Sequence, residues 1–74
     1  MRIAYDREAN ALYIELRSAE PADSVDIEPG VTADLDVEGH IVGIEVLNVT
    51  ERLGSDFLAR ISIEQFPGEL KQPA

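Results

Sequence analysis

Carboxylates are the residues of this 74-residue chain best placed to do chemistry, and one group has the spacing of a calcium-binding loop. Asp34, Asp36 and Glu38 alternate, Gly39 stands at the sixth position, and Glu45 stands at the twelfth. Except at Glu38, this is the pattern of an EF-hand loop. An EF-hand also needs a helix on each side, whereas β-branched residues flank this segment. We therefore expect a β-hairpin, no resident metal and no cofactor, with a weak divalent-cation site on the carboxylate row as a remote alternative.

Groups for nucleophilic or acid–base catalysis are scarce. The chain has no cysteine and a single histidine, His40, and no sequence pattern pairs that histidine with a serine or threonine. Gly39 and Gly43 form neither a P-loop nor a dinucleotide-binding fingerprint. With 15 acidic residues any pair could be chosen as glycosidase carboxylates, but so small a core leaves little room for a substrate cleft. We expect no enzymatic activity and no catalytic residue.

Charge is distributed unevenly along the chain, whose formal net charge is −9. The segment from Ser18 to Glu51 contains nine acidic residues and neither Lys nor Arg. Such a field repels nucleic-acid phosphates and anionic lipid and attracts basic protein surfaces. We therefore expect no direct binding to nucleic acid or membrane, and a small basic protein as partner. The alternative is a solvated face that serves only solubility.

Alternation of apolar and polar residues predicts four to five strands. The first two are Arg2–Asp6 and Ala11–Arg17, with Leu12, Ile14 and Leu16 on the core side and Tyr13, Glu15 and Arg17 on the wet side. The next ends at Pro29-Gly30, the fourth alternates strictly over 31–38, and the last covers 40–49 after a turn at Glu38-Gly39. The wet sides supply the candidate partner-binding residues Asp34, Asp36, Glu38 and Tyr13, since an aromatic on a polar face is typical of interfaces.

The C-terminal third changes pattern. Thr50, or Ser55 after Gly54, is a candidate N-cap for one short helix over Asp56–Arg60. We expect one α+β domain over residues 1–66, a small antiparallel β-meander with one short C-terminal helix. Residues 67–74, which contain two prolines and a glycine, are expected to form a loose tail.

Length and composition bear on environment and assembly. A chain this short buries only about 60% of its unfolded surface, so its core is small. Absence of cysteine favours a reducing cytoplasm, and no segment has the apolar length of a signal peptide or membrane span. Open sheet edges and exposed apolar residues such as Ile41 and Leu47 predict a homodimer.

Two blocks carry a family resemblance. Tyr5-Asp6 followed by Ala11-Leu12-Tyr13-Ile14, and Asp36 with Gly39 followed by the run from Ile41 to Leu47, are similar to the bacterial domain-of-unknown-function family 2283 (DUF2283) over residues 2 to about 53. Asn10 stands where the family pattern has Asp. The resemblance implies a compact β-sheet with a short helix, no established activity, no catalytic residues to transfer, and an antitoxin-like role.

Two functions remain open at this stage. In the first, the chain is a small acidic binding or regulatory module, antitoxin-like, that engages a basic protein. In the second, it is a self-associating structural domain with no dedicated ligand, and its charge serves only solubility.

Overall fold

The computed structural model describes residues 1–67, so the predicted tail 67–74 falls outside the described residues from residue 68 on. Its regular elements in chain order are β1 (Arg2–Asp6), β2 (Ala11–Glu15), β3 (Asp23–Glu28), β4 (Val31–Leu35), β5 (Ile41–Leu47), α1 (Val49–Leu53) and the 3-10 helix η1 (Phe57–Arg60). The predicted fold class, α+β with an antiparallel sheet and a short C-terminal helix, is confirmed.

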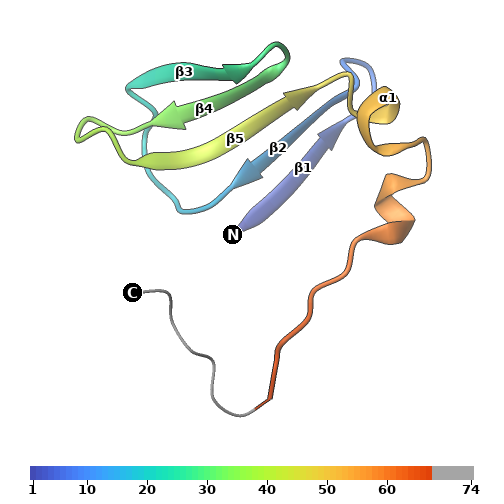
Figure 1. The fold of residues 1–74 in the computed structure, drawn as a ribbon. Coiled ribbons are helices and arrows are strands. Elements are labelled where there is room, and N and C mark those ends of the chain that lie inside the picture. Colours follow the sequence, from blue (N-terminus) through green and yellow to red (C-terminus); the bar gives the residue numbers. More distant parts are fainter. Residues whose placement is uncertain (68–74) are drawn as a thin grey trace.

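The five strands form one antiparallel sheet in the order β1-β2-β5-β4-β3 (Figure 1). Strands that follow one another in the chain pair as hairpins, except that β2 pairs with β5 instead of β3. The connection from Leu16 to Ala22 therefore passes β5 and β4 to reach the far edge. The sheet has two open edges, β1 and β3, and every residue of β3 is exposed.

Strand alternation sorts the side chains onto two faces, because successive residues of a strand point in opposite directions. The cross-strand register places apolar residues together on one face, which we call the apolar face: Ile3, Tyr5, Leu12, Ile14, Val25, Val31, Ala33, Leu35, Val42, Ile44 and Val46. The opposite, polar face carries Arg2, Ala4, Asp6, Ala11, Tyr13, Glu15, Ser24, Asp26, Thr32, Asp34, Gly43, Glu45 and Leu47. The predicted division of β2 between a core side and a wet side is thus confirmed.

The core that joins the helices to the sheet is small and lies at the β1–β2 side. Val49 of α1 and Phe57 of η1 are buried against Leu12. The ring of Tyr5 meets the ring of Phe57 edge-on, with centroids 5.0 Å apart and planes at 85°. Such T-shaped pairs are favourable beyond the area they bury. Tyr5 is therefore the semi-buried core aromatic that its place beside Ile3 predicts.

Glycines with positive φ make two of the hairpin turns. Gly39 has φ +85°, its N–H donates to the Asp36 carbonyl at 3.0 Å, and the Asp36 N–H donates to the His40 carbonyl at 2.9 Å. The hairpin expected at Glu38-Gly39 in place of an EF-hand is therefore confirmed. Gly30, also at φ +85°, closes the β3–β4 turn after Pro29, as at the third position of a type II turn.

The C-terminal helices differ in part from expectation. The helix predicted over Asp56–Arg60 is the 3-10 helix η1, but α1, five residues long, was missed and begins inside the strand predicted for 40–49. Neither Thr50 nor Ser55 is the N-cap residue; Asn48, in the left-handed region, precedes α1 and makes no side-chain cap bond.

The start of α1 is capped from the β1–β2 turn instead. The backbone carbonyl of Asn10 accepts the Val49 N–H at 3.1 Å, and the side-chain Oδ1 of Asn10 accepts the Thr50 N–H at 3.2 Å. Its Nδ2 donates to Glu51 Oε2 at 2.9 Å. These partners lie forty residues away in the chain, beyond the reach of a local capping pattern.

Three strands are also shorter than their sequence patterns, since β4 ends at Leu35 instead of residue 38 and β5 covers Ile41–Leu47 instead of 40–49. β2 ends at Glu15 instead of Arg17, because the N–H groups of Leu16 and Arg17 share the Val42 carbonyl at 2.8 and 3.4 Å. That irregularity turns the chain out of the sheet. Among residues 1–67, no helix has the length and apolar character needed to cross a bilayer.

Candidate partner-binding site on the polar sheet face

Two cross-strand rows organise the polar face. One runs through Ala4, Tyr13, Glu45, Thr32 and Asp26, and the next through Arg2, Glu15, Gly43, Asp34 and Ser24. Each of β2, β3, β4 and β5 contributes one carboxylate to these rows, and the basic side chain in them is Arg2. That arginine is paired with a row neighbour, since its Nη2 lies 3.5 Å from Glu15 Oε2. The polar face is therefore acidic, with one aromatic ring near its centre.

Tyr13 is held in place diagonally across the sheet. From β2 it passes over Gly43 of β5, and its hydroxyl donates to Asp34 Oδ2 of β4 at 3.1 Å. A Cβ at position 43 would lie 2.1 Å from the Tyr13 hydroxyl oxygen, so only glycine leaves space for this arrangement. The ring thus covers the bare backbone of a buried glycine and is fixed before any partner arrives.

The environment of Tyr13 keeps its hydroxyl protonated. Burial raises the pKa of the Tyr13 phenol, and the hydrogen bond to Asp34 and that carboxylate's charge raise the pKa further. The neutral phenol therefore persists above the pH at which a free tyrosine ionises, and it keeps donating to Asp34. Two of the predicted site residues, Tyr13 and Asp34, are brought together in this way.

A hollow of about 300 Å³ opens beside the Tyr13 ring, at the end of the face nearest the β1–β2 turn. Its lining is Ala4, Tyr5, Asp6, Ala9, Ala11, Leu12, Tyr13, Glu45 and Leu47. Three alanines provide the space, and we therefore call it the alanine hollow. Its charged lining residues, Asp6 and Glu45, are both acidic and exposed. This volume is at the lower limit for ligand sites, which suits one long side chain better than a larger substrate.

The other predicted site residues lie elsewhere. β4 ends at Leu35, so Asp36 and Glu38 belong to the β4–β5 turn and not to the sheet face. Asp36 Oδ1 accepts the N–H groups of Glu38 and His40, both at 2.9 Å, and Oδ2 accepts a hydrogen bond from Arg17. The expected row of Asp34, Asp36 and Glu38 is therefore not formed, because the strand alternation stops one residue before Asp36.

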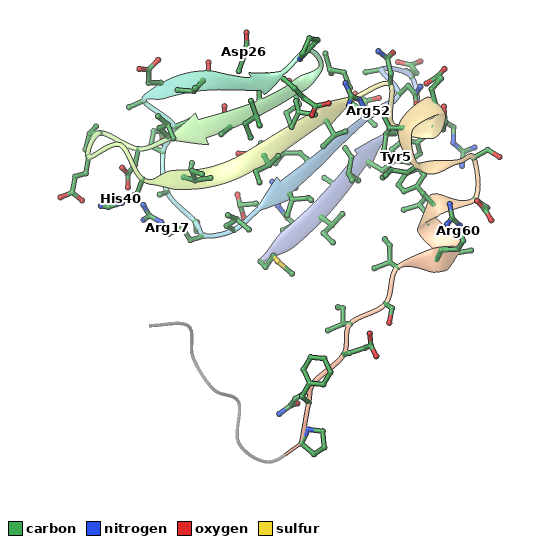
Figure 2. The ribbon with its side chains drawn as sticks, in the orientation of Figure 1. Tyr5, Arg17, Asp26, His40, Arg52 and Arg60 are labelled. Carbon is green, nitrogen blue, oxygen red and sulfur yellow. The ribbon has the colours of Figure 1, made fainter. Side chains whose placement is uncertain are left out.

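Asp36 thus stabilises the β4–β5 turn by accepting hydrogen bonds from within the domain. The hydrogen bond from the His40 backbone N–H, followed by those from Arg17 and the Glu38 backbone, lowers the pKa of its carboxyl. Figure 2 shows Arg17 and His40 side by side at this turn. Glu38 is exposed at the tip, and the alanine hollow lies toward the opposite end of β5, near Leu47.

Metal-ligating side chains do not cluster on this described surface. In the part of the chain that the structure describes, no three His, Asp or Glu side chains lie close enough to hold one ion. The carboxylates of the two rows are separated by Gly43, Thr32 and the Tyr13 ring.

Sequence reasoning missed most of the hollow. Asp6, Glu45 and the alanines were assigned only to strands or turns. A signal was available, because Ala4, Ala11 and Leu47 lie on the same sheet face as Tyr13 and Glu45. Small residues beside an aromatic ring leave space. Recognising it required the β2–β5 pairing, which joins segments separated by about thirty residues.

Comparison with known proteins adds one finding. A family model described as "Protein of unknown function (DUF2283)" matches residues 2–49, which span the whole sheet. No curated protein and no solved structure matches the chain.

Proposed function

Since the chain belongs to the DUF2283 family, whose function is unknown, we propose from its own geometry that it is a protein-binding module for a basic partner. A Lys or Arg side chain of that partner enters the alanine hollow beside Tyr13. The observation that carries this proposal is the lining of the hollow, which combines a fixed aromatic ring with Asp6 and Glu45 and contains no basic residue.

The chemistry of the hollow is complementary to a cationic side chain. The face of a tyrosine ring attracts an ammonium or guanidinium group, and the attraction is stronger where water is excluded. Two carboxylates at the rim accept hydrogen bonds from such a group and balance its charge. The alanine methyl groups and Leu47 offer an apolar wall for the side chain's methylene stem.

The surrounding charge supports a protein partner. The segment without Lys or Arg contributes Asp26, Asp34 and Glu45 to the polar face, so the field around the hollow is negative over several strands. Complementary potentials of this kind accelerate encounter with a basic protein and add specificity. A divalent cation is a weaker candidate for this surface, because such ions are held by several converging oxygens.

The proposal is one of binding and regulation and not of catalysis. An antitoxin-like module that blocks a small basic protein is the form of it that the family resemblance favours. A domain without cysteine suits the reducing cytoplasm, where we place it.

Calorimetric titration with an Arg-containing model peptide, Gly-Arg-Gly-Arg-Gly with blocked ends, tests this function. The double variant Asp6→Asn/Glu45→Gln keeps the size of the lining but removes its charge. We expect it to weaken binding about tenfold or more, as loss of 1.4 kcal/mol implies.

The matched control is Glu20→Gln/Glu38→Gln, which changes the net charge by the same amount at exposed positions outside the hollow. It should weaken binding less than about twofold at the ionic strength of cells, since distant charges are screened. Equal weakening by both pairs, or no measurable binding, would reject the hollow as the site.

A second function, self-association as a structural domain, is favoured by a separate observation. In the part of the chain that the structure describes, α1 and η1 cover one side of the apolar face, and large apolar side chains remain exposed on it.

A further inference from the structure

The apolar face is larger than the layer that covers it. A sheet with one apolar face is stable when a second layer packs on that face. Here α1 has five residues and η1 has four, and both lie beside β1 and β2 (Figure 1). Within residues 1–67, no helix lies over β3 and β4 at the other side of the sheet.

Exposure of individual side chains marks the uncovered area. Ile3 and Val25, at opposite edges of the face, are 40% and 49% exposed. Leu16, which continues the alternation of β2, is 43% exposed, and Ile44 between them is half-buried. A groove of about 270 Å³ bounded by Ile3, Ile14 and η1 continues this surface toward the helices. Exposed apolar residues therefore lie at both edges of the sheet, with the half-buried Ile14 and Ile44 and the buried Ala33 in the row between them.

The chain exposes more surface than a compact monomer of its mass. The chain exposes 5999 Å², whereas a compact monomer of 8.1 kDa exposes about 4500 Å². Part of the difference comes from residues 61–67, which run away from the sheet (Figure 1). The excess of roughly 1500 Å² is therefore an upper bound on the area that the uncovered apolar face adds, and a standard interface takes roughly 800 Å² from each partner.

The charge distribution selects the face on which two copies can meet. With a net charge of −9 each, copies repel one another through their polar faces and through the acidic edge strand β3. Among the described strands, the register places two charged residues on the apolar face, Asp23 and Glu28, and both lie at the rim because they are the ends of the edge strand β3. A two-fold arrangement uses the same patch on both copies, so this face can pack on itself.

From these observations we infer that a second copy of the chain packs face to face on the apolar face, with Ile3, Leu16, Ile44 and Val25 in the contact. The dimer is a two-sheet sandwich whose acidic polar faces, each with an alanine hollow, point outward. This inference concerns the face opposite to the proposed partner site, and neither depends on the other.

Sedimentation equilibrium of the full chain tests the inference. We expect a mass of twice 8.1 kDa at high micromolar concentration, and tighter association at higher salt, because salt screens the repulsion between like-charged copies and leaves apolar contact intact. Binding of a basic partner has the opposite salt dependence, so the two proposals can fail separately.

Substitutions locate the interface. Val25→Lys and Leu16→Lys each place an ammonium group in the contact and should raise the dimer dissociation constant about 100-fold, because an unpaired charge is costly to bury. Val37→Lys is the matched control: Val37 is 87% exposed in the β4–β5 turn, and its replacement should change the dissociation constant less than about threefold.

All three positions are exposed in the single chain, so the variants should fold, and circular dichroism checks that they do. A monomeric wild-type chain at every concentration and salt tested would overturn the inference. A dimer that tolerates both Val25→Lys and Leu16→Lys as well as it tolerates Val37→Lys would overturn it too.

Discussion

At the scale of single residues, the proposed function depends on how Tyr13 is fixed. Its hydroxyl reaches Asp34 only because Gly43 leaves the space between β2 and β4 free. The hydrogen bond removes most of the ring's rotamer freedom before a partner binds, and such preorganisation increases affinity. Asp34 therefore acts on the candidate site by positioning Tyr13, whereas Asp6 and Glu45 supply the charge that faces an incoming cation.

Replacement of Gly43 tests this arrangement. We expect Gly43→Ala to lower the free energy of unfolding by about 1–3 kcal/mol, because the new methyl group overlaps the Tyr13 hydroxyl and forces the ring aside. Urea denaturation measures the change. In a Tyr13→Ala background the same substitution should cost clearly less, and an equal cost in both backgrounds would show that Tyr13 is not what the methyl group displaces.

At the scale of elements, distant side chains hold the short pieces together. Arg52 of α1 makes three hydrogen bonds (Figure 2). Its Nε donates to the Leu47 carbonyl at 3.0 Å, its Nη1 donates to Glu28 Oε2 at 2.8 Å, and its Nη2 donates to the Pro29 carbonyl. It thereby ties the β3–β4 turn to the end of β5. Asn10 connects the β1–β2 turn to the start of α1 through its hydrogen bond to the Thr50 N–H. A five-residue helix has little stability of its own, so these contacts and the burial of Val49 determine that it forms.

Asn10→Ala should destabilise the domain by about 2 kcal/mol. The change removes the cap on the Thr50 N–H, and it places alanine at φ +52°, where a Cβ is unfavourable. Asn10→Gly removes the cap but accepts the backbone angle, so it should cost about 1 kcal/mol. Thermal or urea unfolding distinguishes the two, and equal stability of the Asn10→Ala variant and the wild type would contradict the capping role.

Asp36 makes the β4–β5 turn sensitive to acid. Its folded-state pKa lies below the ordinary value of 3.8, chiefly through the His40 N–H, so the carboxylate stabilises the fold at higher pH. That contribution is fully present above the unfolded-state pKa and is lost as pH falls through the folded-state pKa. Asp36→Asn keeps an acceptor oxygen but no charge. Its urea midpoint should lie below that of the wild type near neutral pH, and the difference should shrink in acid.

Single-strand properties were predictable because they depend on local pattern. Alternation located every strand, the glycine after Glu38 located a turn, and the place of Tyr13 beside Glu15 put it on the polar face. Pairings between distant segments were not predictable from one sequence. The β2–β5 pairing, the reach of Tyr13 to Asp34, and the cap from Asn10 all join residues at least twenty positions apart. The sequence pattern also suggested a carboxylate row through Asp36. That row does not form, because β4 ends at Leu35.

At the scale of the whole molecule, the two proposals assign different tasks to the two faces of one sheet. Within residues 1–67 the apolar face has no second layer beyond α1 and η1, and a second copy supplies it in the proposed sandwich. The polar face keeps its carboxylates in water and presents a fixed tyrosine beside the alanine hollow. A net charge of −9 is consistent with both proposals, because such a charge attracts basic proteins and opposes contact between two acidic surfaces.

The claim that a basic side chain enters the alanine hollow is tested most directly by NMR of alanine methyl groups during titration with the Arg-containing peptide. Ala4, Ala9 and Ala11 line the hollow, while Ala33 is buried on the apolar face and serves as an internal reference. We predict saturable shifts of the three lining methyl resonances, no shift at Ala33, and loss of the response in Asp6→Asn/Glu45→Gln. Shifts that are absent at the lining alanines, or that are equally large at alanines outside the hollow, would contradict the account.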